Sequence, residues 1–503
     1  MFFGLTIVNN LPFLKLINTN TRRYLNIILL TGFLACFFIV IPIPIQLIIF
    51  SIGFGFISTI CFRRASLYIP LVLFFFLPPI AISAINNLNL NNINSGLLKN
   101  HPISIIILSI ALVTIVPNYK LVVGLFKTSN SSMKIALATQ ILFICFLILI
   151  AFLKRNISTV SYALESFIAP FILFLLICFY DRTDAKLVSR LQKIFIILSI
   201  IVCFYGFFEY YFQNNYLYGE LLRKSMKGYE ALTYSDQFRI FTTMGHPLVT
   251  SNALLISFFF LISLYHAGNI SNKYVVVIFS VILIVSLILT GSRSGLLLLF
   301  LGVLLTFSKK ITVKNIFILL SFVMISAGML FLTSQGKFII ERFMSREGLL
   351  SSAVRLQSVF SIGDIIKSSQ WFDATYGKSR DLSDSMILKG VSFENPWLMI
   401  IVDAGVVPAF ICIISFFFII FSLFRSARTG SEKVLAITTL LSICMLSGYS
   451  SFAEKNLTNI FFWFPAAICF CQSRRRMHIV DPCTTDKKST TSGKAGGLGY
   501  VNR

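Results

Sequence analysis

The chain has 503 residues, of which 56% are hydrophobic and only 12% charged, and phenylalanine alone occurs 53 times. Soluble domains carry roughly 25% charged residues, so this composition excludes an ordinary soluble protein. The formal net charge of +24 would suit a nucleic-acid-binding protein. The basic residues, however, lie between apolar stretches in the pattern of a membrane protein, and this placement excludes nucleic acid as the partner.

About 14 apolar stretches come close to the length that spans a bilayer. We therefore expect an all-α polytopic integral membrane protein, with one transmembrane helical domain over 1–473. Residues 474–503 are expected to form a basic, Gly/Ser/Thr-rich cytoplasmic tail without a fixed fold. The predicted spans are 24–41, 45–62, 68–85, 103–119, 135–153, 163–180, 193–212, 247–266, 274–290, 294–308, 314–333, 397–424, 433–450 and 457–472.

Basic residues mark alternate turns between these stretches, which is the positive-inside asymmetry. With 14 spans, this asymmetry places both termini in the cytoplasm. The turn with Lys154 and Arg155 is an exception, because it falls on the predicted outer side. The inner segments carry Arg22, Arg23, Arg63, Arg64, Lys120, Lys127, Lys134, Arg182, Lys186, Arg190, Lys273, Lys309, Lys310, Lys314, Arg425, Arg428, Lys433, Arg474, Arg475 and Arg476.

Two predicted outer segments are longer than simple turns. The first covers 213–246, and the second, at 334–396, would form one large periplasmic loop that includes a helix-like repeat of apolar residues around 352–368. Loops of this length commonly act as lids or binding elements. A solvated outer domain without such a role is the alternative.

Arg293 lies in a short polar break, Gly-Ser-Arg-Ser-Gly over 291–295, between two apolar runs. An arginine at the lip of a membrane bundle is a candidate functional residue, and its planar fork suits a phosphate or carboxylate. Ser292 and Ser294 would add hydroxyl donors. The alternative is that Arg293 extends to lipid headgroups and only sets the topology. Arg239 and Arg355 are placed where an outer cavity would gather them with Arg293.

Several arginines without a metal site favour a diphosphate ligand, and in a membrane the natural form is a lipid-linked diphosphate. The four histidines are scattered and no nucleotide-binding motif occurs, so we expect neither a metal nor another cofactor. A transfer reaction would also need a base. Glu394, where the large loop re-enters the membrane, is the candidate. Its alternative role is a charge at a helix start, with Asn395 as the cap.

Four segments resemble the O-antigen polymerase and O-antigen ligase superfamily of bacterial surface-polysaccharide assembly. The first runs from Arg239 to Pro247, and the second is the Ser-Arg-Ser-Gly-Leu turn at 292–296. The third contains Arg355 and, further on, Gly377. The fourth is Glu-Asn-Pro-Trp-Leu at 394–398, with a glycine at 405. The resemblance covers roughly residues 235–425. The order of the four segments along the chain is more specific than any one of them.

This resemblance implies a bundle like that of the C-type glycosyltransferases, in the bacterial inner membrane with its active face in the periplasm. It also implies a metal-independent, inverting transfer of glycan from undecaprenyl diphosphate. Arg239 and Arg293 would hold the diphosphate, with Arg355, Ser292 and Ser294 beside it. The loop exit, with Asn395, would serve the acceptor. The implied partners are an undecaprenyl-diphosphate-linked oligosaccharide, membrane lipid and, for a polymerase, a chain-length regulator.

Ligases of the family typically have a histidine before the loop-exit asparagine. Here Glu394 stands in that place, after Phe393, and this favours a polymerase whose acceptor is another lipid-linked repeat unit. Glu394 is the predicted base, and His246 is the alternative. Two other functions stay open, a ligase that transfers glycan to lipid A core and a non-enzymatic flippase. A flippase should bury charges along several spans, whereas here the interior charges lie toward the outer ends.

Overall fold

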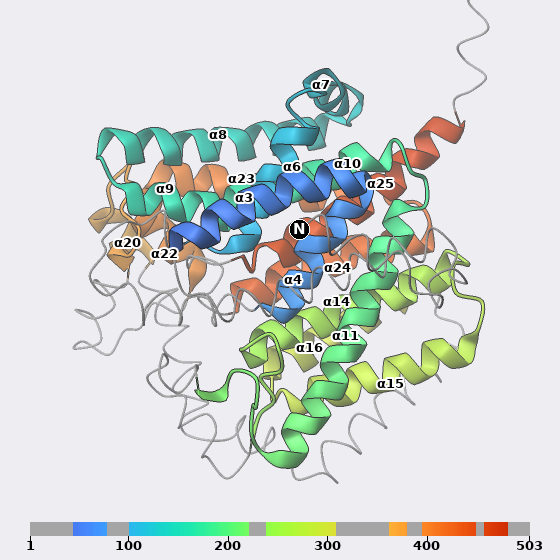
Figure 1. The fold of residues 1–503 in the computed structure, drawn as a ribbon. Helices are drawn as coiled ribbons and strands as arrows, with labels where there is room; N and C mark the ends of the chain where they lie inside the picture. Colours follow the sequence, from blue (N-terminus) through green and yellow to red (C-terminus); the bar gives the residue numbers. More distant parts are fainter. Residues whose placement is uncertain are drawn as a thin grey trace, which may run out of the picture.

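The computed structural model describes residues 44–77, 100–220, 238–307, 362–379, 395–448 and 457–480. The regular elements of this part are all helices (Figure 1). They are α3 (Pro44–Phe62), η2 (Arg63–Leu67), α4 (Tyr68–Phe76), α6 (Pro102–Thr114), α7 (Tyr119–Thr128), α8 (Ser131–Leu153), α9 (Ile157–Ala163), η4 (Leu164–Ile168), α10 (Ala169–Asp181), α11 (Leu187–Phe212), α14 (Pro247–His266), α15 (Lys273–Leu289), α16 (Arg293–Phe307), α20 (Ile362–Ser368), α22 (Pro396–Ala404), α23 (Val406–Ser426), α24 (Gly430–Ser447) and α25 (Ile460–Val480).

Within the described ranges, seven helices are long and apolar enough to cross a membrane. Three shorter apolar helices, α6, α15 and α16, lie among them. The predicted spans 24–41 and 314–333 lie outside the described residues, so the total of 14 stays a prediction. The seven are Ile48–Phe76, Ser131–Leu153, Ile157–Asp181, Leu187–Phe212, Pro247–His266, Val406–Ser426 and Gly430–Ser447.

Helix α8 carries exposed apolar side chains along its outward face, among them Leu142, Leu149 and Phe152. Contiguous apolar surface of this kind is unusual on a soluble monomer, but it is what lipid tails require. Helix α14, in contrast, is buried along almost its whole length. The outer helices therefore face lipid, and α14 belongs to the interior of the bundle.

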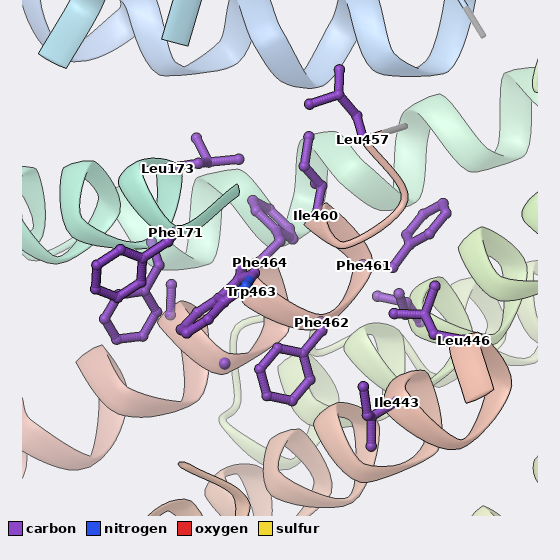
Figure 2. Close-up of a cluster of buried hydrophobic side chains, with 14 of the residues drawn as sticks. Phe171, Leu173, Ile443, Leu446, Leu457, Ile460, Phe461, Phe462, Trp463 and Phe464 are labelled. Atoms are coloured by element: carbon purple, nitrogen blue, oxygen red, sulfur yellow. The ribbon is translucent and has the colours of Figure 1, made fainter. Parts of the chain in front are cut away.

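Successive aromatic residues of α25 point to different neighbouring helices (Figure 2). Phe461 packs edge-on to a ring of α4, with ring centroids 5.0 Å apart. Phe462 meets Phe416 of α23 at 4.5 Å, and Trp463 meets Phe171 of α10 at 5.0 Å. These three consecutive side chains point in different directions around the helix, so α25 packs against α4, α10 and α23 at once.

Helix α16 approaches its neighbours through two glycines, Gly295 and Gly302. A Cβ atom at Gly295 would lie only 2.0 Å from Ser251 Oγ of α14, and one at Gly302 would lie 2.3 Å from Phe259 Cζ. Small residues let membrane helices pack closely where no hydrophobic effect drives them together. These contacts fix α16, and with it Arg293 at its first turn, against the buried helix α14.

The stretch 397–424, expected as one span, is two helices. The chain breaks between α22 and α23 at Gly405, whose φ of +90° suits glycine. Residues 370–373 cross the break, since Asp373 N–H donates to the Ala404 carbonyl (3.1 Å) and Val406 N–H donates to the Gln370 carbonyl (3.0 Å). A side chain at Gly405 would collide with the Asp373 backbone at 2.5 Å. This close backbone approach was not predictable from the sequence.

The turn with the exceptional Lys154 meets the predicted outer loop. Lys154 Nζ lies 2.5 Å from Asp373 Oδ1, and Lys378 Nζ lies 2.9 Å from Asp373 Oδ2. Burial by itself would raise the pKa of Asp373, but hydrogen bonds from Lys154 and Lys378 lower it to about 2. The charge of Lys154 thus has a carboxylate partner at its own end of the bundle, which is why a basic residue is tolerated there.

Contacts between distant segments divide the helix ends into two groups. In each contact below, both residues were predicted on the same side of the membrane. We call the first group the site end and the second the opposite end. Contacts at the site end join Lys154 to Asp373, Thr159 to Ala374, Ile240 to Leu289 and Trp397 to Ser447, and those at the opposite end join Thr114 to Tyr180, Asn130 to Ser426, Arg64 to Asp184 and Ser263 to Ser431.

Cysteine labelling in intact cells tests which end faces outward. Gln213 at the site end and Asn269 at the opposite end are both exposed. In a chain whose native cysteines are replaced by serine, a membrane-impermeant maleimide should modify the Gln213→Cys variant and leave the Asn269→Cys variant unmodified. The opposite pattern would reverse the predicted orientation.

Candidate functional site

Arg239 lies in an irregular segment, residues 238–246, between α11 and α14. This segment runs beside the turn that joins α15 to α16. Ile240 N–H donates to the Leu289 carbonyl at 3.3 Å, and Arg239 Nε donates to the Thr290 carbonyl at 2.9 Å. The second bond fixes the plane of the guanidinium, so Arg239 presents its remaining N–H donors in a set orientation.

The side chain of Arg239 rests on Gly291. Gly291 has φ of +61°, and a Cβ atom there would lie 3.1 Å from Arg239 Nε. Glycine therefore serves both the left-handed turn and the close approach of the arginine. Arg293 follows two residues later as the first residue of α16 and is half-buried. The structure thus places Arg239 against the turn that bears Arg293, although the sequence separates them widely.

The two serines that flank Arg293 differ in their surroundings. Ser292 is buried, and its Oγ accepts a hydrogen bond from Gly295 N–H at 3.1 Å, which satisfies a backbone donor in the first turn of α16. Ser294 is half-buried, with its Oγ 3.4 Å from Ser292 Oγ. The contact of Ser292 supports a structural role as a cap. Ser294 is the more accessible hydroxyl beside Arg293.

His246 is the N-cap of α14. Its Nδ1 accepts a hydrogen bond from Leu248 N–H at 3.2 Å. Burial and the nearby positive charge of Arg239 lower the pKa of His246 to about 4, so the ring is neutral at pH 7. With Nδ1 engaged as an acceptor, the proton resides on Nε2, which makes Nε2 a donor. This arrangement favours capping and hydrogen-bond donation by His246 over a role as general base.

A buried carboxylate holds the residues that follow Arg239. Glu209 of α11 is fully buried, and its two oxygens accept hydrogen bonds from Phe241 N–H at 3.0 Å and Thr242 N–H at 2.6 Å. An acid inside the apolar stretch 193–212 signals a specific partner. Glu209 is one of the interior charges near the outer ends of the predicted spans, but its partners were not predictable, because backbone N–H groups leave no mark in a sequence.

Hydroxyl groups close the turn between Arg239 and His246. Thr242 has φ of +56°, which is unusual for a residue other than glycine. Its Oγ1 lies 2.9 Å from Thr250 Oγ1, and Thr250 Oγ1 is also 2.9 Å from the Phe241 carbonyl oxygen. The first turn of α14 therefore helps to hold Thr242 in its strained conformation.

Asn395 caps α22, with its Oδ1 accepting a hydrogen bond from Trp397 N–H at 3.0 Å. Trp397 in turn donates from Nε1 to Ser447 Oγ at 2.9 Å, which joins α22 to the end of α24. This is the helix cap expected of Asn395 in the alternative to a catalytic Glu394. Arg355 and Glu394 lie outside the described residues.

Among the residues that the structure describes, no group of three or more His, Cys, Asp or Glu side chains is arranged to hold a metal ion. The groups described at the site end are the Arg239 guanidinium, held by the Thr290 carbonyl, Arg293 in the first turn of α16, and His246, whose Nε2 is a donor. Such an arrangement can bind an anion and stabilise negative charge that develops on it.

Comparison of the chain with protein-family models, with curated proteins and with solved structures finds no match in any of the three.

Proposed function

We propose that the chain is a polymerase of lipid-linked oligosaccharide repeat units. It would transfer a growing glycan from undecaprenyl diphosphate to another lipid-linked unit at the outer face of the bacterial inner membrane. The observation that supports this proposal best is the packing of Arg239 on Gly291, with its Nε bonded to the Thr290 carbonyl. This packing brings a fixed guanidinium to the turn that carries Arg293, at the lip of a membrane bundle.

The proposed chemistry uses these two arginines for the leaving group. In an inverting transfer, the acceptor hydroxyl attacks the anomeric carbon, the bond to the diphosphate oxygen breaks, and the electron pair leaves with the diphosphate. Donors already in place stabilise that charge without reorganisation. The proton of the acceptor passes to a base, for which Glu394 is proposed. His246, neutral and donating from Nε2, would contribute a hydrogen bond to substrate.

A gene deletion tests the polymerase proposal. Surface polysaccharide from a bacterial strain that lacks the chain should run on a gel as lipid A core with a single repeat unit, because ligation continues while polymerisation stops. Core with no repeat unit would contradict the polymerase and support the ligase or the flippase alternative. Unchanged long polymer would contradict both transferase proposals.

Arg293 variants returned to that strain test the anion site. Arg293→Ala should lower polymer by roughly 100-fold to 1,000-fold, the usual cost of removing one donor to a developing negative charge. Arg293→Lys should recover little, since an ammonium lacks the planar fork. Arg425→Ala, which removes an exposed arginine at the opposite end, is the matched control and should leave polymer unchanged. Full activity of Arg293→Lys would identify Arg293 as a topology anchor.

Glu394→Gln tests the proposed base. The amide keeps the size of the side chain but cannot take a proton, so polymer should fall by roughly 100-fold to 10,000-fold. His246→Gln is the comparison, because glutamine retains an acceptor and a donor near the same place, and we expect a smaller loss. An inactive His246→Gln beside an active Glu394→Gln would move the base to the segment before α14.

A further inference from the structure

Glu209 is a fully buried acid in the span Leu187–Phe212, close to the C-terminal end of α11. Ionisable groups within membrane spans are costly and are kept where they have a specific task. Three N–H donors converge on this carboxylate. Oε1 accepts from Phe241 N–H at 3.0 Å and from Asn215 Nδ2 at 3.2 Å, and Oε2 accepts from Thr242 N–H at 2.6 Å.

Two of these donors belong to the backbone of the segment that carries Arg239. The segment is also tied to the last residue of α15, through Ile240 N–H to the Leu289 carbonyl. The backbone is therefore held by two elements within three residues of Arg239. Both anchoring residues belong to helices, α11 and α15, but the segment itself is not helical, so the position of the arginine depends on these hydrogen bonds.

We infer that Glu209 is a positioning residue for Arg239: its carboxylate holds residues 241–242 so that the guanidinium meets the diphosphate of the lipid-linked donor in a fixed orientation. This role rests on the proposed function, since the bound diphosphate gives the orientation its purpose. Glu209 touches neither substrate nor reacting atoms in this role. It acts through the backbone, and its effect should disappear when Arg239 is absent.

A glutamine in place of Glu209 removes the negative charge but keeps the size of the side chain. Glu209→Gln retains one carbonyl oxygen, but its NH₂ group faces a backbone N–H where Oε2 accepts now. One N–H of the segment is thereby left without an acceptor. The matched control is Glu165→Gln, because Glu165 is also a buried acid in a span and its Oε2 accepts His101 N–H at 2.9 Å. It contacts a different segment.

The experiment measures binding of undecaprenyl diphosphate to purified protein in detergent micelles, in a double-mutant cycle. Glu209→Gln should weaken binding by about 10-fold to 100-fold, as expected for a lost hydrogen bond to a charged group, and Glu165→Gln should not weaken it. In the Arg239→Ala background, Glu209→Gln should cause no further loss. Hydrogen exchange at Phe241 and Thr242 should rise in Glu209→Gln and stay unchanged in Glu165→Gln.

The outcomes separate this inference from the proposed function. If the unsubstituted protein does not bind undecaprenyl diphosphate, the proposed function fails and the positioning role fails with it. If it binds and Glu209→Gln binds equally well, or if the losses from Glu209→Gln and Arg239→Ala simply add, the positioning role alone is overturned. Should Glu209→Gln not fold, Glu209→Asp takes its place in the cycle, since it retains both anionic oxygens at a shorter reach.

Discussion

A buried backbone that is not helical needs a partner for its N–H and C=O groups, because water does not reach them. Several groups of residues 238–246 find such partners in three other elements. Glu209 of α11 accepts from Phe241 and Thr242, the Leu289 carbonyl accepts from Ile240, and Thr250 of α14 closes the turn. The geometry around Arg239 follows from this set of bonds, so its orientation is a property of the bundle and not of a flexible loop.

Glycines determine how closely the turn with Arg293 approaches Arg239. Gly291 leaves room for the side chain of Arg239, while Gly295 and Gly302 let α16 pack closely against α14. A Cβ atom at any of these three positions would meet another atom at 3.1 Å or less. The turn with Arg293 is thus held from two sides. The side chain of Arg239 packs against it, and α16, which follows it, packs against α14.

Span positions were predictable where polar residues interrupt an apolar run. The stretch 247–266 matches α14 in both bounds, since His246 and Pro247 mark its start. The break at Gly405 and the partners of Glu209 were not predictable, because both depend on backbone groups far away in sequence. Within the candidate site, the sequence picked out Arg239, Arg293 and His246. It could not show that His246 caps a helix or that Ser292 does the same.

The two ends of the bundle differ in how their polar groups are arranged. At the opposite end, arginines pair with aspartates: Arg190 Nη1 lies 3.0 Å from Asp184 Oδ2, and Arg475 pairs with Asp181. The helices there are joined by short turns, such as the one between α23 and α24. At the site end the backbone leaves the helical form at 238–246, which Glu209 holds through N–H groups, and again at Gly405, where backbone hydrogen bonds with residues 370–373 cross the break. Irregular backbone inside a membrane bundle is tolerated where it is enclosed by protein or lines a cavity. A reaction that needs donors in fixed positions is therefore favoured at the site end, where specific hydrogen bonds hold the irregular backbone.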